Sequence, residues 1–131
     1  MHEPIWMEKQ ETLSAHSLQL SEHGGSDGIR DETLLESALA KPKNVFAYED
    51  DADLCRLAAS YAFGIARNHP FVDGNKRAAL VTAEGFLSFN VLRIVAPKEE
   101  KYATFIHLAD GSLTEVELAQ WFRSHAEPRP R

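Results

Sequence analysis

The sequence predicts an all-α fold, a bundle of helices around one buried central helix. Apolar residues recur at the i, i+3, i+4 and i+7 spacing of amphipathic helices along most of the 131 residues. Turn-forming residues separate these periodic segments, and residues 75–90 are apolar on nearly every side beyond their first turn. We therefore expect residues 75–90 to be the central helix, with at most a small β hairpin or flap near residues 26–48.

Helix start and stop signals set the bounds of six predicted helices. The first ends at the pair Gly24-Gly25, and the second ends before Pro42, because proline disrupts a helix interior. The third starts among aspartates, with Asn68 as its C-cap, and the sixth begins with a capping box of Thr114 and Glu117. The predicted helices are, in order, residues 5–23, 31–40, 51–68, 75–90, 98–109 and 115–125.

The remaining segments give weaker signals. Residues 24–28 read as a turn or mobile loop, and residues 92–96 could form a brief strand. Residues 44–48 could be extended or could begin another helix. We expect residues 1–126 to form a single domain and residues 127–131 to be a disordered tail.

Composition predicts a soluble cytoplasmic protein. A formal charge of −6 argues against a nucleic-acid-binding surface over the whole domain, so no direct nucleic acid binding is expected. No apolar run approaches the ~20 residues that span a bilayer, and the N-terminus lacks the apolar core of a signal peptide, so no membrane association is expected. Cys55 is the only cysteine, which rules out an internal disulfide, and it is interpreted as a small buried hydrophobe.

The strongest functional signal is the nonapeptide at residues 69–77, His-Pro-Phe-Val-Asp-Gly-Asn-Lys-Arg. It joins the third and fourth predicted helices, and its second half opens the fourth. Free backbone N–H groups at that helix start, with Gly74 able to adopt positive φ, could form an anion-binding nest. The positive charges of Lys76 and Arg77 at a helix N-terminus oppose the helix dipole. They lower the stability of the helix by roughly a few tenths of a kcal/mol unless an anion is bound there. A bound phosphate would remove this conflict.

His69 and Asp73 supply the chemistry beside this cradle. A neutral imidazole can take a proton from a hydroxyl at physiological pH, and a carboxylate next to phosphates is a place for Mg²⁺. Base, metal carboxylate and anion cradle are together the parts of phosphoryl or nucleotidyl transfer. Phe71 is interpreted as an apolar anchor of the loop. A purely structural loop of cap and turn residues is the alternative.

These residues resemble the signature of the Fic/Doc family, His-x-Phe-x-(Asp/Glu)-Gly-Asn-Gly-Arg-x-x-Arg. Residues 28–31, 34–39 and 61–68 also look like death-on-curing toxins, so the resemblance spans roughly residues 5–125. It implies the Fic fold, with residues 24–48 as a flap that docks a target segment as an added strand. The matching motif positions are His69, Phe71, Asp73, Gly74, Asn75 and Arg77.

Two departures from the general Fic pattern favour one branch of the family. Lys76 stands where Fic adenylyltransferases have the second Gly, and Leu80 stands where they have the final Arg. In the family, that Gly leaves room for the nucleotide diphosphate and that Arg holds the γ-phosphate, so their joint loss argues against AMP transfer. Asn-Lys-Arg instead resembles the death-on-curing form, whose members phosphorylate elongation factor Tu and arrest translation.

The resemblance implies a toxin of a toxin–antitoxin pair that uses ATP and Mg²⁺ to phosphorylate a hydroxyl of a protein like elongation factor Tu. It also implies a separate small antitoxin, because the chain contains no Ser/Thr-x-x-x-Glu-Gly/Asn stretch of the self-inhibiting kind. A Fic-type nucleotidyltransferase and a non-catalytic nucleotide-binding module remain alternatives. The implied roles are general base for His69, Mg²⁺ ligand for Asp73, and phosphate contacts for Gly74, Asn75, Lys76, Arg77 and, less directly, Arg67.

The other histidines receive no site role. We interpret His16, His23 and His107 as surface or internally satisfied side chains, because each lies on a helical pattern.

Overall fold

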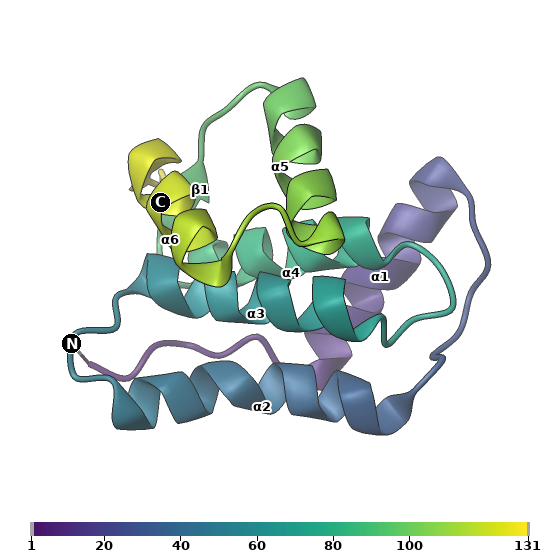
Figure 1. Ribbon diagram of the computed structural model, residues 1–131, viewed down its shortest axis with the longest axis horizontal. Helices are drawn as coiled ribbons and strands as arrows, with labels where there is room; N and C mark the ends of the chain where they lie inside the picture. The colour runs from purple at the N-terminus through teal and green to yellow at the C-terminus, as the bar shows by residue number, and fades with distance from the viewer. Residues whose placement is uncertain (1, 131) are drawn as a thin grey trace.

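A computed structural model describes residues 2–130, and this part of the chain contains six helices and one two-stranded sheet (Figure 1). The predicted all-α class with a small β element is confirmed, and so is the capping box of Thr114 and Glu117. The elements are α1 (Lys9–His23), α2 (Glu32–Tyr48), α3 (Leu54–Asn68), α4 (Asn75–Phe89), β1 (Leu92–Ile94), α5 (Lys98–Asp110), α6 (Glu115–His125) and β2 (Ala126–Pro128).

A buried central helix is present, but it is α3 rather than the predicted α4. Helix α3 packs against α2, α4, α5 and α6, as Figure 1 shows, and its side chains are buried around most of its circumference. The physical reason is its small residues, including Ala58, Ala62 and Gly64, which let neighbouring helices approach on several sides. The first turn of α4 instead carries two exposed cations, Lys76 and Arg77, so this helix is less enclosed than α3.

The prediction that the second helix ends before Pro42 is wrong, because α2 continues through this proline to Tyr48. Proline in a helix interior costs about 3 kcal/mol, but tertiary packing can override such a propensity. Leu35, Ala38 and Leu39 are buried with Pro42 along α2. Residues 44–48, which the sequence left undecided, are therefore helical.

The brief strand predicted within residues 92–96 is confirmed as β1, whereas the expected β-structure near residues 26–48 is not found. Strands β1 and β2 pair antiparallel, with Arg93 opposite Glu127, and the N–H of Arg129 donates to the carbonyl of Val91 (2.9 Å). The expected hairpin or flap within residues 26–48 is replaced by a loop, one isolated bridge between Ile29 and Phe71, and α2. Residues 127 and 128, which the sequence analysis placed in the tail, lie in β2 and pair with β1.

No helix within residues 2–130 combines the length and the apolar character that crossing a bilayer requires.

Candidate active site

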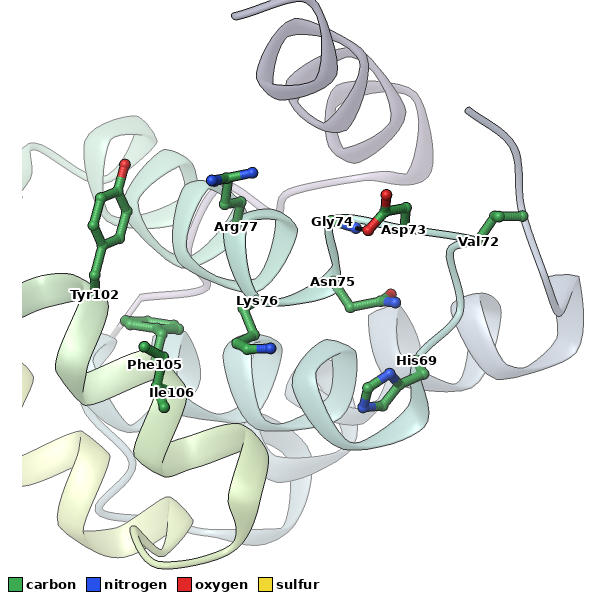
Figure 2. A pocket seen from close by; sticks show the side chains of 10 residues that line it. All are labelled: His69, Val72, Asp73, Gly74, Asn75, Lys76, Arg77, Tyr102, Phe105 and Ile106. Carbon is green, nitrogen blue, oxygen red and sulfur yellow. Dashed lines mark hydrogen bonds between the residues drawn. The ribbon is translucent and has the colours of Figure 1, made fainter. Parts of the chain in front are cut away.

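The motif loop between α3 and α4 borders a pocket of about 490 Å³. Seven of its lining residues belong to the segment 69–77, and α5 supplies the rest as an apolar wall (Figure 2). This wall consists of Tyr102, Phe105 and Ile106, which the sequence analysis did not assign to a site. The pocket therefore joins a polar helix start to an apolar surface.

His69 is the C-cap residue of α3, a position that the sequence analysis gave to Asn68. Its backbone is left-handed (φ 50°, ψ 54°), and its N–H donates to the carbonyl of Ile65 (3.2 Å). The side chain is exposed and lines the pocket. Left-handed backbone is uncommon for a residue with a Cβ, and such strain clusters at functional sites.

Asp73 carries a carboxylate that two backbone groups hold in place. Oδ1 accepts from the N–H of Gly74 (2.8 Å), and Oδ2 accepts from the N–H of Ser26 (3.3 Å). The bond from Gly74, then that from Ser26, with Arg77 and His16 contributing less, lowers the pKa of Asp73 below its ordinary range. An exposed carboxylate that stays ionised fits a Mg²⁺ ion, which binds few protein oxygens and completes its shell with water and phosphate.

The start of α4 has the form of an anion site. Gly74 is the N-cap with φ 75°, and no side chain caps the helix. The N–H of Gly74 is occupied by Asp73, so the donors left for an anion are the first backbone N–H groups of the helix itself. Of the three N–H groups expected to form the nest, that of Gly74 is therefore engaged, and those of Asn75 and Lys76 are left.

Lys76 and Arg77 bring positive charge to this helix start. Both are exposed and line the pocket, and no ion pair within residues 2–130 involves either of them. Figure 2 shows Lys76 on the side of His69 and Arg77 on the opposite side of the helix start. An anion in the pocket would therefore meet one cation from each side.

Asn75 plays a different role from the phosphate contact expected of its side chain. Its carboxamide is bonded in both directions to Phe71: Nδ2 donates to the carbonyl (3.0 Å), and Oδ1 accepts from the N–H (3.0 Å). The residue is buried, with 9% of its surface exposed. The side chain therefore closes the motif loop, and its backbone N–H is what can face a phosphate.

His16 is a residue of this site that the sequence did not reveal. It is buried rather than on the surface, stacks on Phe71 with ring centroids 3.8 Å apart, and its Nε2 donates to the carbonyl of Asp73 (2.8 Å). The interpretation as a satisfied histidine is correct, but its partners are the motif itself. Thr12, one turn earlier on α1, is buried as well, but both residues are polar, so the apolar pattern of the sequence gave no signal for this inward side.

Arg67 and Leu80 lie apart from the anion cradle. Arg67 does not line the pocket; its guanidinium lies 5.6 Å from the ring centroid of Phe63 and beside Gly111 in the α5–α6 turn. Leu80 is buried, with 6% exposed, one helical turn beyond Lys76. Of the predicted site residues, the structure thus brings His69, Asp73, Gly74, Asn75, Lys76 and Arg77 together and leaves Arg67 outside.

A helical domain with a histidine, a carboxylate and two cations around the junction between two helices is typical of Fic-type proteins. Residues 6–87 match the model of the Fic/DOC family, and the chain belongs to this family. Helix α5, which forms the apolar wall of the pocket, lies outside the matched segment.

Two relatives place the chain in the death-on-curing branch of the Fic/DOC family, as predicted. The chain is 31% identical over 114 residues to the protein kinase doc of Escherichia phage P1, an alignment that covers 87% of this chain and 90% of that protein. It is 35% identical over 92 residues to the toxin Doc of Mycolicibacterium smegmatis, an alignment that covers 70% of this chain and 68% of that protein.

Proposed function

We propose that this chain is the toxin of a toxin–antitoxin pair and acts as a protein kinase. It transfers the γ-phosphate of ATP, with Mg²⁺, to a hydroxyl of a translation factor like elongation factor Tu and thereby arrests translation. Two relatives named as a protein kinase and as a toxin support this proposal. The observation that carries it is the exposed Lys76 at the start of α4, which lines the same pocket as His69.

The proposed reaction uses residues that already lie together. The imidazole of His69 takes the proton of the target hydroxyl, whose oxygen then bonds to the γ-phosphorus while the bond to the bridging oxygen breaks and ADP leaves. Lys76, Arg77 and the first N–H groups of α4 hold the phosphate oxygens. Asp73 would hold Mg²⁺, which neutralises phosphate charge when bound.

Leu80 supports phosphate transfer over nucleotide transfer. Its buried side chain offers no cation where adenylyltransferases of the family place the Arg that holds the γ-phosphate. Lys76 fills the space that a Gly would leave open and adds a point charge to the cradle. We infer that the triphosphate lies with its γ end, rather than its α end, toward His69.

The partners follow from the same proposal. We infer a separate small antitoxin, which inhibits through a helix laid in an apolar groove, and a cytoplasmic site of action where translation factors are found.

The decisive experiment separates the two phosphates of ATP. ATP labelled at the γ or at the α position is given to the purified protein together with cell extract and, in parallel, purified elongation factor Tu. Protein-bound label from γ alone is expected. Label from α alone would establish the nucleotidyltransferase instead, and nucleotide binding without any transfer would leave a binding module.

A matched pair of histidine variants tests the base. His69→Ala should abolish transfer and growth arrest, while His107→Ala, an exposed histidine of α5 outside the pocket lining, should preserve both. Circular dichroism checks that both variants keep the fold. Growth arrest that survives in His69→Ala would exclude this residue as the base.

A further inference from the structure

The segment that leads into α2 is hydrogen-bonded along the motif loop. The carbonyl of Pro70 accepts from the N–H groups of Arg30 (2.7 Å) and Asp31 (3.1 Å), and the N–H of Val72 donates to the carbonyl of Gly28 (3.0 Å). Residues 28–31 therefore form a strap across the loop that carries His69. We call residues 28–31 the strap below.

Arg30 makes the contact of the strap that lies closest to His69. Its Nε donates to the carbonyl of His69 (2.7 Å), and its Nη2 donates to the carbonyl of Asn68 (2.8 Å). These are the final carbonyls at the α3 C-terminus, where a cation is favoured by the helix dipole. The planar guanidinium fork makes both bonds at once, so it fixes the orientation of two successive peptide groups.

We propose that Arg30 is a positioning residue for the general base, and this rests on the function proposed above. Left-handed backbone is unfavourable for His69, so it persists only where the surroundings over-determine it. The guanidinium holds the carbonyls on both sides of the His69 N–Cα–C unit. That grip sets the direction in which the imidazole leaves the chain, toward the pocket.

The competing interpretation is a simple helix cap. A cap would contribute to stability alone, and the folded protein would then react equally fast without it. A positioning residue, in contrast, acts on the rate, because a misplacement of about 1 Å can slow catalysis about 100-fold. The two interpretations therefore differ in kcat measured on folded protein.

The experiment compares Arg30→Ala and Arg30→Gln with Arg129→Ala. Arg129 is a matched control, since its Nε donates to the carbonyl of Ser88 (3.0 Å) near the other end of α4, away from the pocket. We expect Arg30→Ala to lower kcat about 10- to 100-fold with an unchanged KM for ATP. Millimolar guanidinium ion should restore part of the rate in Arg30→Ala. It should leave the rate of the control Arg129→Ala unchanged.

A second readout does not depend on activity. The ¹³Cα shift of His69, which reports its backbone conformation, should move in Arg30→Ala and return with guanidinium. If the wild-type protein transfers no phosphate, the proposed function fails, while this shift still tests the grip of Arg30. An unchanged kcat and shift in both Arg30 variants would reduce Arg30 to a cap. A raised KM with unchanged kcat would make it a substrate contact, and either result overturns the proposal.

Discussion

Lys76 opposes the electrostatics of its own helix, because it stands in the first turn of α4, where the dipole favours anions. We predict that Lys76→Ala stabilises the unliganded protein by about 0.3–1 kcal/mol. The same change should weaken ATP binding about tenfold or more, since a hydrogen bond from a charged group contributes about 1.5–3 kcal/mol. Urea unfolding and titration calorimetry measure the two effects.

Lys9 provides the control for this pair of measurements. Lys9 is the first residue of α1, just as Lys76 lies in the first turn of α4. Lys9, however, pairs with Glu32 and does not line the pocket. Lys9→Ala should leave ATP affinity unchanged. An affinity that is equally unchanged in Lys76→Ala would remove Lys76 from the phosphate cradle.

Asp73 gives the site a defined dependence on pH. Backbone bonds from Gly74 and Ser26 lower the pKa of its carboxyl in the folded state. A lowered folded pKa contributes stability above the unfolded value of about 3.9, and this contribution is lost as pH falls through the folded pKa. We predict that carboxyl ¹³C NMR shows Asp73 titrating below the ordinary value.

Asp73→Asn is the matching variant. Its stability should fall less steeply than that of the wild type as the medium is acidified below about pH 4. If the stabilities of the two proteins declined in parallel with falling pH, or if Asp73 titrated at an ordinary pKa, these two backbone bonds would not be the cause of a lowered pKa.

At the scale of elements, the contact between α2 and α3 depends on the absence of one side chain. A Cβ on Gly64 would lie 3.1 Å from the Cβ and 3.2 Å from the Cα of Ala38. Backbone cannot yield cheaply, so Gly64→Ala should destabilise the fold by about 1–3 kcal/mol, as overpacking does. The shift of the urea midpoint measures this loss.

Gly85 in α4 offers a matched glycine with a different neighbour. A Cβ there would meet the end of the Met7 side chain (2.8 Å), which is flexible and can turn aside. Gly85→Ala should therefore be neutral or stabilising by up to about 1 kcal/mol, since alanine favours helix interiors. Equal losses in both variants would show that helix–helix approach is not what distinguishes Gly64.

At the scale of the whole molecule, Cys55 reports on unfolding. Burial first, and then Asp53, raises the pKa of this thiol to about 11, although helix N-termini ordinarily lower it. We predict that an aromatic disulfide reagent at mildly alkaline pH labels the native protein only as fast as it opens. Labelling should become immediate above the urea midpoint, and rapid labelling without urea would show that α3 opens locally at its start.

The sequence predicted best what depends on neighbours in the chain. The motif, the capping box and most helix bounds arise from contiguous residues, so their signals are local. The passage of α2 through Pro42 depends instead on packing against α3, and β2 forms only because β1 offers a partner. His16 and Arg30 escaped detection as site residues because both act on the motif across long stretches of chain.

The turn after α4 also determines which hydrogen bonds resist a mechanical force applied to the ends of the molecule. Asn90 exchanges hydrogen bonds with the backbone of Ile5, while Arg129 bonds to Ser88 and Val91. A force that pulls residues 5 and 129 apart is thus borne by these few bonds at one end of α4. The pocket lies at the other end of this 15-residue helix, about 22 Å away. Stretching in an optical trap should therefore peel β2 and the first residues away while His69 and its cradle remain assembled.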